Sequence, residues 1–77
     1  MWWLEAFERH GDKLIHEYAM PERLDNARVA SILRVREEDL LSRSWPLTLD
    51  QLHQFEVLIS EPLIAGDFDY YLSYYRK

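Results

Sequence analysis

Apolar and polar residues alternate along the start of the chain, in two runs over residues 2–9 and 13–20. The runs flank a polar segment that contains the turn-permissive Gly11, and this arrangement predicts a β-hairpin with a short loop. Pro21 ends the second run, because proline has no N–H to donate to a strand ladder. Both faces of the runs are mixed, so a single amphipathic helix over residues 2–9 is an alternative. As a strand, the first run would carry on one face Trp3, Glu5 and Phe7.

A helix is predicted to follow the hairpin, beginning after Asp25. The carboxylate of Asp25 is a suitable N-cap, since it can accept hydrogen bonds from the free N–H groups of the first turn. Leu24 and Val29 stand at the spacing of a hydrophobic staple around this cap. A short apolar stripe at helical spacing then ends near Val35. Its members are Val29, Ile32 and Leu33.

A polar connector over residues 37–44 follows and is compatible with a helical turn. It contains two leucines, Leu40 and Leu41, which we expect to be buried. Trp45-Pro46 closes it. The connector opens with three acids, Glu37, Glu38 and Asp39.

The clearest local signal is a capping box formed by Thr48 and Gln51, with Leu47 and Leu52 as its hydrophobic staple. The pattern predicts a helix that starts at residue 49 and runs until Glu61-Pro62 stops it. Its core-facing stripe comprises Leu52, Phe55 and Ile59.

The last segment, residues 68–75, fits two periodicities. Phe68, Tyr71, Leu72 and Tyr75 share a helical face, whereas alternation and β-forming residues fit a strand. A strand would complete a ββααβ sheet, and a helix would give ββααα. The fold class is α+β in either case, as a single small domain over residues 1–77.

Aromatic residues are abundant, at eleven of 77, and gather at Trp2-Trp3 and between residues 70 and 75. A small domain can bury only some of them. We expect four in the interior: Phe7, Trp45, Phe55 and Tyr71. The others form an expected acidic aromatic patch that is suited to a protein interface. The main members of this patch are Tyr70, Tyr74 and Tyr75 beside Asp67 and Asp69.

Charge is distributed unevenly. Residues 1–36 hold six acids and six bases, whereas residues 37–77 hold eight acids and three bases, which accounts for the whole net charge of −5. An acidic half argues against binding to nucleic-acid phosphates and favours a partner with a basic surface. Cysteine is absent, which fits the reducing cytoplasm, and no apolar run is long enough to span a membrane.

The candidate catalytic residues are not spaced as a metal site or an acid–base site requires. The three histidines, His10, His16 and His53, form no metal-binding pair, and the acid pairs lie in connectors that should be solvated. No nucleophile elbow or glycine-rich phosphate loop is present. The sequence therefore predicts no catalytic residue, no metal site and no cofactor, and we expect a protein that is not an enzyme.

The order of these segments resembles a family of small bacterial domains. The resemblance rests on the aromatic first strand, Leu14-Ile15-His16-Glu17, the acidic residues 37–39, Trp45-Pro46-Leu47-Thr48, and Phe68-Asp69-Tyr70-Tyr71-Leu72. Some members resemble immunity proteins encoded beside contact-dependent growth inhibition systems or other polymorphic toxins. The chain departs from the pattern at residues 40–43, where members carry a tighter acidic turn with a proline.

The resemblance implies an antitoxin in the bacterial cytoplasm. Such a protein binds a cognate toxin domain and occludes its functional surface, and a basic nuclease would match the acidic chain by charge. The predicted partner contacts are Glu37, Glu38, Asp39, Asp67, Asp69, Tyr70 and Tyr74. The alternative function is a regulatory or adaptor module without a toxin partner, which could be a homodimer sealed by the tyrosines.

Overall fold

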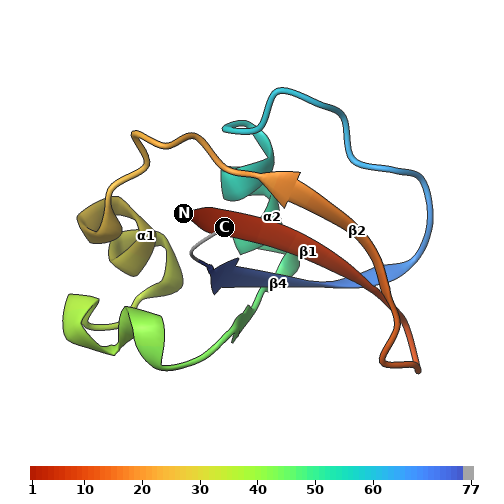
Figure 1. The fold of residues 1–77 in the computed structure, drawn as a ribbon, viewed down its shortest axis with the longest axis horizontal. Coiled ribbons are helices and arrows are strands. Elements are labelled where there is room, and N and C mark those ends of the chain that lie inside the picture. The colour runs from red at the N-terminus through yellow and green to blue at the C-terminus, as the bar shows by residue number, and fades with distance from the viewer. Residues whose placement is uncertain (76–77) are drawn as a thin grey trace.

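A computed structural model describes residues 1–75 as one four-stranded antiparallel sheet packed against two helices (Figure 1). The strand order is β2-β1-β4-β3, so that the first and last long strands are neighbours at the centre. This arrangement confirms the α+β class and the single small domain. No helix within residues 1–75 combines the length and the apolar character needed to cross a membrane.

The N-terminal hairpin is confirmed. Strands β1 (Trp2–Glu8) and β2 (Leu14–Ala19) pair antiparallel, with Leu4 opposite Tyr18. The turn is closed by the Gly11 N–H, which donates to the Glu8 carbonyl at 3.1 Å. The alternative helix over residues 2–9 is wrong, because this segment has a strand partner on both sides and alternates its side chains between two faces.

The C-terminal segment is a strand, β4 (Phe68–Tyr74), and the helical alternative is wrong. It pairs along the whole of β1, with Leu4 opposite Leu72. This long ladder supplies hydrogen-bond partners for the edge of β1 that does not face β2. If residues 68–74 formed a helix, that edge of β1 would lack these partners. A two-residue strand that the sequence did not predict, β3 (Trp45–Pro46), pairs with the outer edge of β4.

Both helices begin where their caps predict. In α1 (Asn26–Leu33) the Arg28 N–H donates to the Asp25 carboxylate at 2.8 Å. In α2 (Leu49–Glu56) Thr48 and Gln51 form the reciprocal capping box. The second helix ends at Glu56, earlier than the predicted stop at Glu61-Pro62, because the next N–H groups bond to carbonyls three residues back instead of four.

The acidic connector forms a 3-10 helix, η1 (Glu37–Ser42), which agrees with the predicted helical turn. Only one of its two leucines is in the interior: Leu40 is fully buried, whereas Leu41 is 60% exposed. The expectation that both are buried is therefore wrong, since adjacent residues of one helical turn point in different directions.

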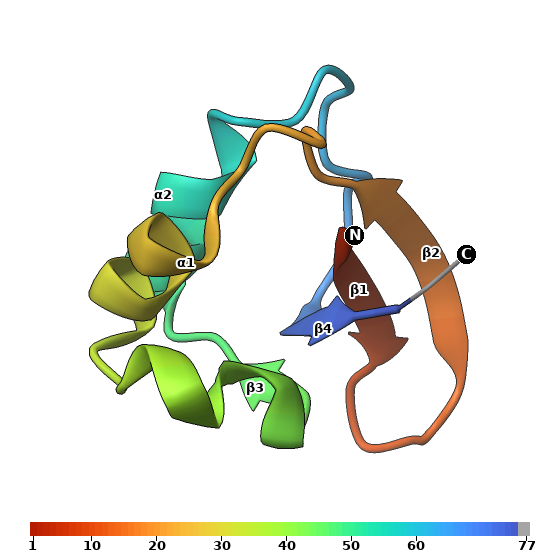
Figure 2. The ribbon, with the colours of Figure 1, turned by 60° about the vertical axis from the view of Figure 1, so that its left-hand side comes forward.

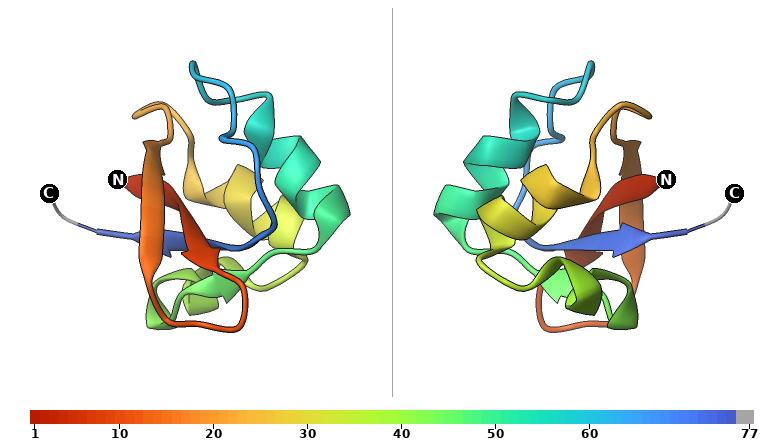
Figure 3. Two further views of the ribbon diagram at one scale, coloured as in Figure 1. Left: turned by 90° about the vertical axis from the view of Figure 1, so that its right-hand side faces the viewer. Right: turned by 90° about the vertical axis from the view of Figure 1, so that its left-hand side faces the viewer.

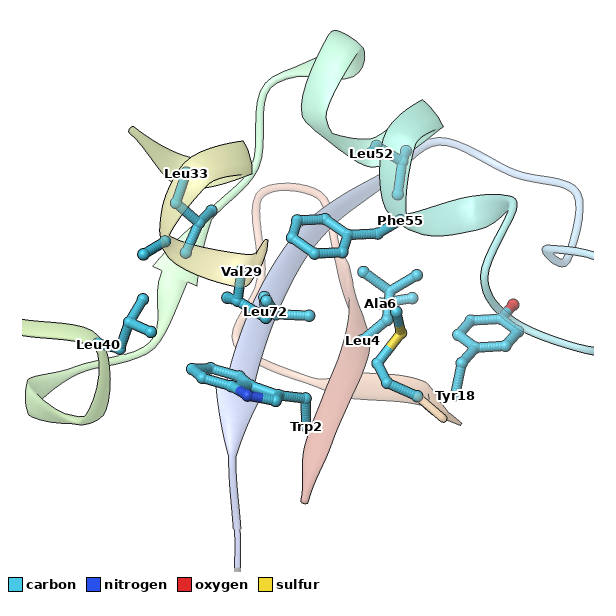
Figure 4. Close-up of a cluster of buried hydrophobic side chains, with 12 residues drawn as sticks. Trp2, Leu4, Ala6, Tyr18, Val29, Leu33, Leu40, Leu52, Phe55 and Leu72 are labelled. Carbon is cyan, nitrogen blue, oxygen red and sulfur yellow. The ribbon is translucent and has the colours of Figure 1, made fainter. Parts of the chain in front are cut away.

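One hydrophobic core lies between the helices and one face of the sheet (Figures 2 and 4). Phe55 is at its centre, as predicted, and Trp45 is half-buried at its rim. Trp2 and Tyr18 take the places expected for Phe7 and Tyr71, which lie on the opposite face because strand alternation assigns them there. The Trp2 indole N–H finds an acceptor in the Asn26 side chain at 3.1 Å.

Candidate functional site

The helices α1 and α2 cover the same side of the sheet, and no α-helix among the described residues 1–75 covers its opposite side (Figure 3). We call this opposite side the open face. Alternation from the buried Leu4 and Leu72 places on the open face Trp3, Glu5, Phe7, Asp69, Tyr71 and Ser73. The open face therefore combines aromatic and acidic side chains at the centre of the sheet.

Glu5 is the most unusual residue of the open face. It lies on the central strand and is only 4% exposed. The Ser73 hydroxyl donates to its Oε1 at 2.6 Å, and the Tyr75 hydroxyl donates to its Oε2 at 3.0 Å. Ser73 also bonds to the Ser44 hydroxyl at 2.7 Å, which links β4 to the residue before β3. A network of hydroxyls thus holds the carboxylate in one position.

A hollow of about 270 Å³ opens beside Glu5, between the hairpin turn and the residues that lead into β3. Three carboxylates and three aromatic rings line it, and no basic residue among residues 1–75 does so. The Phe7 and Tyr71 rings meet edge to face, with centroids 5.5 Å apart. Its lining residues are Glu5, Phe7, Gly11, Asp12, Ser44, Asp69, Tyr71 and Tyr75. The chemistry of this lining suits a positively charged group.

The histidines lie apart from this hollow. The His16 ring contacts the Tyr18 ring at a tilt of 58°, with centroids 4.5 Å apart, and the His16 Nε2 is 3.7 Å from a Glu61 carboxylate oxygen. His53 is exposed in the last turn of α2. Within residues 1–75 no group of three or more His, Asp or Glu side chains is placed to hold a metal ion.

The three predicted contacts of the acidic connector lie together in the first turn of η1. Arg36 partly neutralises them, since its guanidinium is 2.9 Å from a Glu38 oxygen and 3.4 Å from an Asp39 oxygen. Glu37 is exposed beside them. This turn is a surface of its own and does not line the hollow.

The four predicted contacts at the C-terminal end are divided. Asp67 and Asp69 share the Arg9 guanidinium, at 2.7 and 3.7 Å, and Asp69 also lines the hollow. Tyr70 and Tyr74 point toward the helix side of β4, where Tyr70 packs against the core. Burial raises the pKa of the Tyr70 hydroxyl, and the nearby Tyr18 and Glu56 raise it further.

Sequence reasoning missed Glu5 and Ser73 as site residues. The sequence does single out Glu5, because it is an acidic residue between two aromatic residues, Trp3 and Phe7, on the same face of the predicted strand. No local pattern marks Ser73, since its role depends on the pairing of β4 with β1.

The chain belongs to the family described as a domain of unknown function, DUF7683, which matches residues 1–73. No curated protein matches the chain, and no solved structure matches it. The family description states no activity and gives no link to immunity proteins or toxins.

Proposed function

We propose that this DUF7683 domain is an immunity protein that binds a cognate toxin domain with a basic surface, such as a nuclease, and occludes it. The observation that carries the proposal is the open face, where a hollow is lined by three carboxylates and three aromatic rings and, in the described part of the chain, by no basic side chain. Aromatic anchors beside carboxylates are typical of surfaces that recognise basic proteins.

The charge of the hollow supports a foreign partner over a second copy of the chain. Two copies meeting open face to open face would set Glu5, Asp12 and Asp69 against the same carboxylates. Like charges placed in an interface oppose association, whereas a basic partner is attracted and steered to its site. A homodimer across this face is therefore the weaker alternative.

A nuclease fits this chemistry because its functional surface carries the Lys and Arg side chains that contact phosphates. An acidic domain bound there competes with the nucleic acid by charge and by volume. Under this proposal the chain works by occupancy, catalyses no reaction, needs no cofactor, and meets the delivered toxin in the bacterial cytoplasm. The acids at the start of η1, with Asp67, Tyr70 and Tyr74, are proposed as additional contacts.

The test starts from the product of the adjacent gene. We expect that gene to encode a secreted protein with a toxic C-terminal domain, and we expect the purified domain to form a stable complex with this chain. Co-expression should restore growth, and the affinity should fall as salt rises from about 50 to 500 mM. An adjacent product that neither binds the chain nor loses toxicity on co-expression would overturn the proposal.

A further inference from the structure

The charge of Glu5 lacks a cationic partner in the described part of the chain. Glu5 is 4% exposed, and both of its hydrogen bonds come from neutral hydroxyls, those of Ser73 and Tyr75. No arginine, lysine or histidine among residues 1–75 forms an ion pair with it. A buried carboxylate is costly unless a cation or several hydrogen bonds compensate it. Its position is therefore suited to a positive group from outside.

The walls of the hollow fit such a group. The faces of aromatic rings attract cations, and Phe7, Tyr71 and Tyr75 supply three rings around the same space. Asp12 in the hairpin turn adds a carboxylate that has no ion pair within residues 1–75. Asp69 adds a third carboxylate, which lies 3.7 Å from the Arg9 Nε. The volume of about 270 Å³ is below the range of roughly 300–1,000 Å³ typical of small-molecule sites. A single side chain suits this space better than a cofactor.

We infer that the hollow binds one arginine side chain of the partner protein. This inference rests on the proposed function and specifies the group by which the partner is recognised. Arginine fits better than lysine, because its planar guanidinium can stack on a ring while its N–H groups bond to carboxylates in the same plane. The Ser73 and Tyr75 hydroxyls hold the Glu5 carboxylate in place before the partner arrives.

Nuclear magnetic resonance of the full chain tests this inference without the partner. The probe is Nα-acetyl-arginine amide, and its control is the citrulline analogue, which has nearly the same shape but no charge. We expect saturable shifts of the backbone amides of Glu5, Gly11, Asp12 and Tyr71 with arginine, smaller shifts with the lysine analogue, and none with citrulline. Equal shifts with citrulline, or shifts scattered over the domain, would overturn the inference.

Three variants test whether the response is specific to the hollow. Asp12→Asn removes a charge from an exposed turn and should weaken the arginine response severalfold, whereas Glu22→Gln, an exposed acid outside the hollow, should leave it unchanged. Glu5→Gln should abolish the response, with its amide spectrum confirming that the domain is folded. If Asp12→Asn responds as strongly as Glu22→Gln, the inference fails.

The two experiments distinguish a failure of this inference from a failure of the proposed function. If the toxin domain binds and is neutralised but arginine does not shift the hollow, the inference is wrong and the function stands. If arginine occupies the hollow but the adjacent gene product neither binds nor is neutralised, the function is wrong and the cation site stands.

Discussion

The Ser73 hydroxyl donates a 2.6 Å hydrogen bond to the Glu5 carboxylate, across strands that are 68 positions apart in sequence. Both residues are almost completely buried, at 2% and 4% exposure. Because the acceptor is a charged group that water scarcely reaches, the bond matters both for stability and for the shape of the open face.

Ser73→Ala is therefore expected to destabilise the domain by about 1.5–3 kcal/mol, the usual cost of losing a hydrogen bond to a charged group. Urea unfolding measures the change through the midpoint at constant slope. The matched control is Ser60→Ala, at an exposed position, which should change stability by less than about 0.5 kcal/mol. Equal midpoints for the two variants would mean that the Glu5 carboxylate does not depend on Ser73.

Leu40 and Leu41 form a natural pair for testing the orientation of η1. Leu40 is fully buried and Leu41 is 60% exposed. Leu40→Ala should cost about 2–5 kcal/mol, because it leaves a cavity in the core, whereas Leu41→Ala should cost less than about 0.5 kcal/mol. Thermal or urea unfolding followed by circular dichroism checks this difference. Similar losses in both variants would contradict the observed orientation of the turn.

Thr48 caps the second helix through its hydroxyl, which accepts from the Gln51 N–H at 3.2 Å. Thr48→Ala should lower the free energy of unfolding by about 1 kcal/mol, since it leaves an N–H of the first turn without a partner. Thr48→Ser keeps the hydroxyl and should retain most of the stability. A Ser variant as unstable as the Ala variant would show that the cap is not the cause.

The raised pKa of Tyr70 makes the free energy of unfolding depend on pH in the alkaline range. Burial raises its pKa above the ordinary value of 10.0, so the folded domain holds this proton more tightly than the unfolded chain. The stabilising contribution is present in full below the unfolded pKa of about 10 and is lost as pH rises through the folded value. Tyr70→Phe should therefore lose less stability than the wild type between about pH 9 and 11, measured by urea unfolding at each pH. An equal loss in both proteins would contradict this assignment.

The starts of the helices could be read from sequence because capping is local. Asp25 and Thr48 each bond to an N–H only three residues away. The segment Phe68–Tyr74 could not be assigned in the same way, since its residues fit both periods and only its ladder with β1 decides for a strand. The two-residue β3 is too short to have a period at all.

Most of the candidate site could not be predicted from the sequence, because it also depends on how the strands pair. The hydroxyls that bond to Glu5 lie 68 and 70 positions from it in sequence, and only the register of β4 brings them together. The predicted acidic aromatic patch assumed that neighbours in sequence share a surface. In a strand they alternate, so Asp69 and Tyr71 reach the open face while Tyr70 and Tyr74 point to the other side.

The central claim is that the chain binds a basic protein through its open face, and the affinity for the adjacent gene product tests it most directly. Isothermal titration should compare the wild type with two variants that each lose two charges. Asp12→Asn/Asp69→Asn removes charges from the hollow, whereas Glu22→Gln/Glu61→Gln removes them elsewhere. We predict that the hollow variant binds about tenfold or more weakly, roughly 1.4 kcal/mol, and that the other stays within about twofold of the wild type. Equal affinities for the two variants would contradict the claim.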